Sequence, residues 1–154
     1  MNNSHPEPPV IGFRRIRPEA ILPAYQSEGA AGMDLVACTD QLQPIVIPPG
    51  EIRIIPTGWA VSIPKGLEGQ VRPRSGLATK FGLTVPNAPG TIDSDYRGEV
   101  AVALINLGRQ PFTVEHGMRI AQLVIAPVAR AIIREASKLT PTARGEGGFG
   151  STGV

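Results

Sequence analysis

The fold is decided by residues 44–66, which read PIVIPPGEIRIIPTGWAVSIPKG. Three apolar runs follow one another here, and each ends in turn-forming residues, first Pro-Pro-Gly, then Pro-Thr-Gly, then Pro-Lys-Gly. Apolar residues at alternate positions indicate strands, while proline and glycine mark the turns between them. The first expected strand is 44–47. The second carries Ile52 and Ile54 and ends at the Pro-Thr-Gly turn, and the third carries Trp59, Val61 and Ile63 on one face.

The same pattern continues towards the C-terminus. Residues 100–105 are apolar at every position, so both faces of this strand should be covered and it should lie inside a sheet. Further strands are expected at 112–114 and 120–125. One short helix is predicted, with Ser75 as its N-cap and Gly82 as its stop signal. Many short strands at close spacing predict an all-β sandwich, jelly-roll or barrel-like domain.

The composition fits one globular domain. The chain has 154 residues, of which 42% are hydrophobic and 18% charged, and its 16 prolines and 18 glycines favour turns over long helices. A net charge of +2 without a basic run argues against a nucleic-acid binder, and no apolar run is long enough to span a membrane. The single cysteine, Cys38, is interpreted as a small buried hydrophobic residue. Residues 1–9 lack a signal-peptide pattern and are expected to form a frayed arm, so we expect a cytoplasmic protein.

Two polar residues interrupt apolar strands. Asp34 follows Ala-Gly-Met, where it could cap its own turn or face a hydrated divalent cation, because Mg²⁺ keeps much of its water shell. Gln122 lies among isoleucine, alanine and leucine, and a buried amide needs a partner. That partner could be a main-chain group or a phosphate oxygen.

A candidate anion site precedes the predicted helix. Arg74 and the Ser75 hydroxyl stand beside the free N–H groups of Ser75 and Gly76. A helix N-terminus carries partial positive charge and unpaired donors, which suit a phosphate. A structural cap explains Ser75 alone, but it does not explain Arg74.

Residues 87–99 read NAPGTIDSDYRGE and carry a candidate base-binding segment. A tight turn at Pro89-Gly90 should lead into a strand at 91–93, with residues 95–98 as the returning arm of a hairpin. Such a hairpin can offer main-chain donors and acceptors to the edge of a flat base, with the Asn87 amide beside them. One of the two acids in the segment could be a simple turn residue.

The C-terminal residues 144–153 read RGEGGFGSTG. Glycines let backbone N–H groups approach an anion closely. Arg144 adds a planar fork of donors for phosphate oxygens, and Phe149 offers a face on which a base can stack. The segment is interpreted as a flap that closes over a nucleotide, the alternative being a disordered polar terminus.

Together these segments resemble the five ordered motifs of the trimeric deoxyuridine triphosphatases (dUTPases). They are residues 31–35, 73–78, 90–99, 119–123 and 144–153. The resemblance implies a jelly-roll-like (β-clip) subunit assembled as a homotrimer, with active sites shared between subunits. It also implies a division into an arm and first strand entry (1–16), a β-domain (17–143) and a flap (144–154).

The implied activity is magnesium-dependent hydrolysis of dUTP to dUMP and pyrophosphate, which keeps uracil out of DNA and supplies dUMP for dTMP synthesis. By this resemblance, Asp93 is the general base that activates water at the α-phosphorus, and Asp34 contacts Mg²⁺ through water while the substrate phosphates hold the ion. The implied ligands of the phosphates are Arg74, Ser75, Gly76, Gln122 and Arg144. The implied contacts to nucleoside are Asn87, Gly90, Thr91, Ile92 and Tyr96, with Phe149, Gly150 and Ser151 arriving on the flap.

Selectivity would follow from the same residues. Main-chain groups matched to uracil are left unpaired by cytosine, which supports discrimination on the order of 10⁴–10⁵. Tyr96 under the sugar would exclude a 2′-hydroxyl. Two alternatives on the same scaffold stay open: a dCTP deaminase, and a regulatory nucleotide-binding protein without catalysis. An inert β-rich module leaves the polar residues without a shared explanation.

Overall fold

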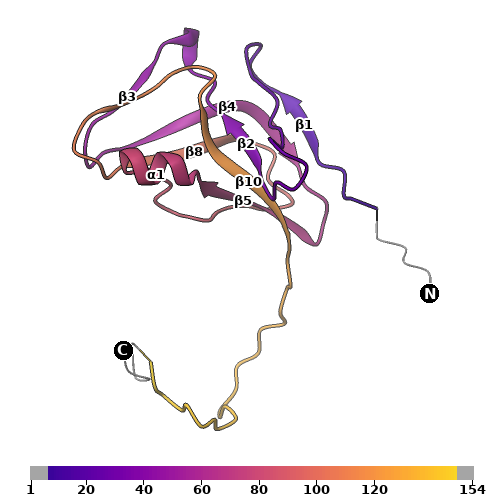
Figure 1. Cartoon of the computed structure of the whole chain (residues 1–154). Helices are drawn as coiled ribbons and strands as arrows, with labels where there is room; N and C mark the ends of the chain where they lie inside the picture. The colour runs from indigo at the N-terminus through magenta and orange to yellow at the C-terminus, as the bar shows by residue number, and fades with distance from the viewer. Residues whose placement is uncertain (1–6, 149–154) are drawn as a thin grey trace.

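The computed structural model describes residues 7–148, and they form a β-rich body with one α-helix (Figure 1). The strands are β1 (Gly12–Arg15), β2 (Met33–Val36), β3 (Ile45–Ile47), β4 (Ile52–Ser62), β5 (Leu67–Pro73), β6 (Leu83–Thr84), β7 (Gly90–Ile92), β8 (Glu99–Asn106), β9 (Phe112–Val114) and β10 (Arg119–Pro127). The helix is α1 (Ser75–Phe81), and a short 3₁₀ turn, η1, spans Asp40–Leu42. The predicted all-β fold with one short helix is confirmed.

The strands form two four-stranded sheets and one two-stranded sheet. Their orders are β1-β4-β8-β6, β2-β10-β5-β7 and β3-β9, and every pairing is antiparallel. One hydrophobic cluster joins the sheets, with Val102 and Leu104 of β8 on one side and Ile120 and Leu123 of β10 on the other. Burying such side chains contributes about 1.5–3 kcal/mol each, which makes this shared core the main source of stability.

The region 52–63 differs from the prediction of two strands separated by a turn. The chain forms one eleven-residue strand, β4, whose pairing with β8 shifts between Pro56 and Ala60. Gly58 has a positive φ of 77°, so the Pro-Thr-Gly sequence makes a bulge within the strand rather than its end. Ile52 and Ile54 are also not core residues, because they are 48% and 70% exposed.

Strand β5, one of the two inner strands of the second sheet, was not predicted from the sequence. Its alternating residues Leu67, Gly69 and Val71 are interrupted by glycine, which weakens the strand signal. The structure explains this glycine. A Cβ at Gly69 would lie 3.0 Å from side-chain atoms of both Ile63 and Leu123, so any side chain here would force these neighbours to shift.

Strand β8 lies between β4 and β6, as the doubly apolar pattern predicted. Val100, Val102 and Leu104 are buried, but on the other face Ala101 is exposed and Ile105 half-buried. In a single chain this second face is therefore only partly covered.

Helix α1 begins one residue earlier than expected. Arg74, and not Ser75, is the N-cap, because its backbone is extended while its carbonyl oxygen accepts the N–H groups of Leu77 and Ala78. The prediction of Ser75 as the cap is wrong by one position. Gly82 ends the helix in the left-handed conformation, as predicted.

A smaller cluster lies under the first strand. Trp59 packs with Ala20 and Cys38, and its indole N–H donates to the Ile21 carbonyl at 2.9 Å. Burial raises the pKa of the Cys38 thiol, which keeps it protonated and unreactive. The interpretation of Cys38 as a buried hydrophobic residue is confirmed.

After β10 the chain leaves the body and runs away from it as an extended segment (Figure 1). Its last main-chain bond to the body joins the Val128 N–H to the Gly66 carbonyl. Ile132, Ile133 and Leu139 lie beyond that point and are exposed, Ile133 by 94%. Across residues 7–148, no helix is long and apolar enough to cross a membrane.

Candidate active site

The first group of site residues is an acid–arginine cluster made by Asp34, Arg74, Arg119 and Gln122. Asp34 in β2 pairs with Gln122 in β10, and its side chain is only 3% exposed. Arg119 Nη1 donates to Asp34 Oδ2 at 3.1 Å, and Gln122 Nε2 donates to Oδ1 at 3.3 Å. A buried carboxylate needs such partners, because an unpaired charge in the interior is strongly unfavourable.

The cluster answers two questions that the sequence left open. Asp34 is a strand residue and not a turn cap, and Gln122 donates to a carboxylate and not to a main-chain carbonyl. Arg119 was not among the candidate site residues. An arginine opening an apolar strand three positions before Gln122 was the available signal.

Arg74, the residue between β5 and α1, joins the cluster. Its Nη1 donates to the Arg119 carbonyl at 2.8 Å, and its Nη2 lies 3.7 Å from Asp34 Oδ2. Ser75 and Gly76 follow it at the exposed start of α1. Of the predicted phosphate ligands, Arg74 and Gln122 thus meet at Asp34, and Ser75 and Gly76 are the next residues after Arg74.

The donor set of the cluster limits how it could hold a metal ion. Within the described part of the chain there is no group of three or more metal-ligating His, Cys, Asp or Glu residues. Asp34 is one carboxylate with two arginines beside it. It fits an outer role, accepting a hydrogen bond from metal-bound water, and it does not fit a cage that binds Mg²⁺ by itself.

The second group surrounds a cavity of about 320 Å³. Asn87, Gly90, Thr91, Ile92, Asp93 and Tyr96 line it, together with residues of β4 and β8. Gly90 is buried there, and a Cβ at this position would lie 3.2 Å from the Asn87 amide nitrogen and 3.3 Å from Val71 Cβ. Glycine therefore keeps the amide close to the backbone. Asp93 is exposed at the edge of the cavity.

The predicted hairpin at 91–98 is wrong. β7 covers Gly90–Ile92 and pairs with Gly69–Val71 of β5, whereas residues 93–98 form a turn and loop that lead into β8. The Tyr96 N–H donates to the Asp93 carbonyl at 3.1 Å and closes that turn. The strand β7 is thus held by pairing with β5, which is distant in the sequence, and the residues of the segment alone do not reveal this pairing.

Glu99 was recognised as part of the motif but was not among the candidate site residues. Its carboxylate accepts hydrogen bonds from Arg17 Nε at 2.8 Å and from the Gly58 N–H at 2.8 Å. The bond to Glu99 raises the pKa of Arg17, so the guanidinium stays charged. The pair holds the start of β8 beside the cavity.

The two groups lie at opposite corners of one sheet. β2 carries Asp34, and Asp93 directly follows β7, the other edge strand, so three strand spacings give about 14 Å across the sheet. Asp34 and Arg72 both pair with Gln122 and so lie at the same level of the sheet, whereas Ile92 pairs with Gly69. Asp93 is one residue further along, level with Glu68 and so four residues from the level of Asp34. This offset adds about 13 Å along the strands and places the two acids about 20 Å apart.

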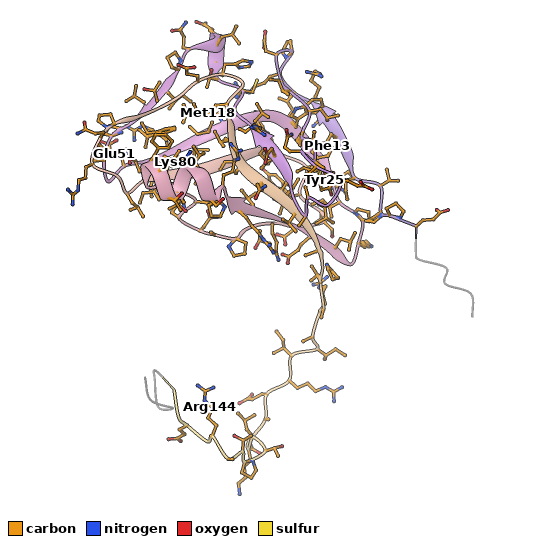
Figure 2. The ribbon with its side chains drawn as sticks, viewed as in Figure 1. Phe13, Tyr25, Glu51, Lys80, Met118 and Arg144 are labelled. Carbon is orange, nitrogen blue, oxygen red and sulfur yellow. The ribbon has the colours of Figure 1, made fainter. Side chains whose placement is uncertain are left out.

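The predicted flap begins at Arg144, which belongs to neither group. Arg144 lies far out on the extended segment, away from Tyr25 and Met118 on the body (Figure 2). Its Nε donates to the Gly147 carbonyl at 2.7 Å, a contact within the segment. Phe149, Gly150 and Ser151, which were predicted to cover the base, lie outside the described residues.

A family model described as dUTPase matches residues 18–153. The chain belongs to the dUTPase family. A deoxyuridine 5'-triphosphate nucleotidohydrolase of Rhizobium etli (strain CFN 42) is 56% identical, and the match covers 100% of both chains. The corresponding protein of Methylocella silvestris is 59% identical over 96% of this chain and 94% of its own.

Solved structures of other dUTPases have the same fold. The dUTPase of Staphylococcus bacteriophage 80alpha with dUpNHpp is 27% identical, with a TM-score of 0.85 over 94% of this dUTPase chain and 99% of that one. A phage phi11 dUTPase variant, whose structure describes a structural Mg(II) ion, has a TM-score of 0.75 at 24% identity, which supports the fold alone. It covers 84% of this chain and 98% of its own. The resemblance drawn from the five motifs is confirmed.

Proposed function

We propose that this protein is a dUTP diphosphatase that converts dUTP and water to dUMP and pyrophosphate. The observation that carries the proposal is the cavity beside β7, which has an amide, main-chain edge groups and a tyrosine in its wall and a carboxylate at its edge. Membership of the dUTPase family and the dUTP analogue bound by a related phage enzyme support the same substrate.

Uracil would bind in this cavity. Gly90, Thr91 and Ile92 bring main-chain groups to its wall, and the Asn87 amide lies against Gly90. Uracil presents acceptor, donor and acceptor along its pairing edge, while cytosine reverses part of that order. A site built for one pattern leaves buried groups unpaired with the other, which is the strongest form of discrimination available to binding. Tyr96 would lie under the sugar.

The triphosphate would extend towards an acid–arginine cluster. Arg74, Ser75, Gly76 and Gln122 would contact its oxygens, with Arg119 adding positive charge. Mg²⁺ bound by the phosphates would neutralise charge that repels the nucleophile, and Asp34 would orient its water. Asp93 accepts a proton from water while the water oxygen bonds to the α-phosphorus. The bond from that phosphorus to the bridging oxygen then breaks, and pyrophosphate leaves.

A homotrimer with shared sites would bring the two groups together. Asp93 and Asp34 of one chain are about 20 Å apart, which is too far for a general base and a metal-orienting acid acting on one triphosphate. Asp93 of one subunit would therefore act with Asp34 of its neighbour. In support, an apolar strip formed by Ile52, Ile54 and Ala101 is exposed on the β4–β8 face, and Ile54 and Ala101 also line the cavity. A second copy of the chain fits that strip.

The C-terminal residues would complete the site as a flap formed by residues 144–154. The segment from Val128 carries exposed isoleucines and a leucine, which gain stability only when they lie on another surface. Its glycine-rich end would then place Arg144 at the phosphates and Phe149 over the base.

A pyrophosphate-release assay over four nucleotides tests the proposed function. With magnesium, we expect dUTP to be hydrolysed at least about 10³-fold more efficiently than dCTP, dTTP or UTP, because each competitor leaves groups unpaired or clashes with the wall. Chelating the metal with EDTA should abolish most of the dUTP activity, and adding Mg²⁺ should restore it. Ammonia released from dCTP would instead indicate a deaminase, and tight dUTP binding without hydrolysis would indicate a regulatory protein.

A further inference from the structure

The ring of Tyr96 is held against the backbone of Gly98. A Cβ built on Gly98 would lie 2.7 Å from Tyr96 Cζ and 3.0 Å from Cε2, and closer still to the hydroxyl oxygen. Real side chains do not approach so closely, so the ring occupies the space that any other residue at 98 would need. Tyr96 is nevertheless 43% exposed, and it is one of the residues that line the cavity.

Two hydrogen bonds fix the same tyrosine at its ends. The phenol hydroxyl donates to the Glu99 carbonyl at 2.9 Å, and the Tyr96 N–H donates to the Asp93 carbonyl at 3.1 Å. The position of the ring is thus coupled to the turn that carries Asp93. A ring that left Gly98 would lose its bond to Glu99.

The carbonyl that receives the hydroxyl is itself anchored. The carboxylate of Glu99 receives two bonds from Arg17, at 2.8 and 3.2 Å, and one from the Gly58 N–H. Glu99 is also the first residue of β8 and pairs with Ala60 of β4. The hydroxyl therefore donates to a rigid acceptor. We call Gly98, Glu99 and Arg17 the tyrosine clamp.

We infer that Gly98 is a specificity-determining residue, which through the tyrosine clamp sets how strongly the enzyme prefers deoxyribose to ribose. The inference rests on the proposed function, in which Tyr96 lies under the sugar. A flat wall excludes an added hydroxyl only while it cannot retreat or tilt. The Tyr96 ring is held in one position because Gly98 has no side chain to displace it and because the Glu99 carbonyl that accepts its hydroxyl is anchored.

The test compares hydrolysis of dUTP and UTP by the full-length wild type and Gly98→Ala. The measured quantity is kcat/KM for dUTP divided by kcat/KM for UTP. We expect Gly98→Ala to lower this ratio about tenfold, mainly through a higher kcat/KM for UTP, because the added Cβ displaces the ring, breaks the bond to Glu99 and leaves room for the 2′-hydroxyl. Gly29→Ala is the matched control, since a Cβ there meets no atom within 4 Å, and its ratio should equal that of the wild type.

A second variant covers the case in which Gly98→Ala does not fold. Tyr96→Phe removes the hydroxyl but keeps the ring on Gly98, and it should lower the ratio by a smaller factor. A wild-type ratio in the folded variants, or an equal loss of activity towards both nucleotides, would overturn the inference. Failure of the proposed function is distinguishable, because the wild type would then release no pyrophosphate from dUTP.

Discussion

Asp93→Asn is expected to lower kcat for dUTP by about 10²–10⁴ while leaving nucleotide binding close to that of the wild type. Asparagine has almost the same shape as aspartate but cannot accept the proton of the attacking water. The backbone bond from the Tyr96 N–H to the carbonyl of residue 93 is unaffected, so the turn should persist. Single-turnover pyrophosphate release gives the rate, and calorimetry with dUpNHpp gives the affinity.

Asp95→Asn is the matched control for this experiment. Asp95 is exposed in the same loop, two residues after Asp93. The substitution Asp95→Asn therefore removes the same charge without changing the proposed base. We expect it to keep activity within a few-fold of the wild type, as is usual for a surface substitution. Near-normal turnover by Asp93→Asn, or an equal loss in both variants, would show that Asp93 is not the general base.

Deletion of residues 144–154 should lower kcat by about 10³–10⁵, the range that an arginine contributes in other phosphoryl-transfer enzymes. The described residues of this segment bond to one another and to nearby Thr142, and not to the β-rich body, so removal of the segment should not disturb the core. Unchanged thermal unfolding and unchanged oligomer mass would confirm that only the flap is lost. The rate is measured as saturating dUTP hydrolysis.

Two point variants separate the arginine from the rest of the segment. Arg144→Ala should reproduce most of the loss, because Arg144 supplies the charge. Arg134→Ala removes the same side chain from an exposed position on the same extended segment, outside the glycine-rich sequence, and should have little effect. A truncated protein with full activity would rule out the flap.

The sequence predicted the elements that are determined locally. Alternating apolar residues identified β9 and most of β10, and Gly82 marked the end of α1. It failed where distant strands decide the structure. Gly58 signalled a turn but makes a bulge in β4, because pairing with β8 continues on both sides of it. Gly69 concealed β5, since only the packed side chains around it explain why that strand contains a glycine.

The candidate site follows the same division. Asp34, Arg74, Gln122 and Asp93 could be selected from the sequence because their types and motifs are local properties. The distance between Asp93 and the other three residues could not be predicted, because it depends on the strand order β2-β10-β5-β7. The same holds for Glu99, whose partner Arg17 is far away in the sequence. Domain boundaries at 16 and 143 stay predictions.

Mixed oligomers test the central claim, that one active site combines Asp93 of one subunit with the acid–arginine cluster of another. Asp93→Asn and Arg74→Ala chains, each inactive alone, are unfolded together, refolded as a mixture and assayed with dUTP and Mg²⁺, with mixed assembly verified by mass spectrometry. We expect roughly a quarter of wild-type activity. A site is active only when the subunit that supplies residue 93 has an intact Asp93 and the neighbour that supplies residue 74 has an intact Arg74, and in an equal mixture each condition is met about half of the time. Mixed oligomers no more active than the separate variants would contradict the shared site.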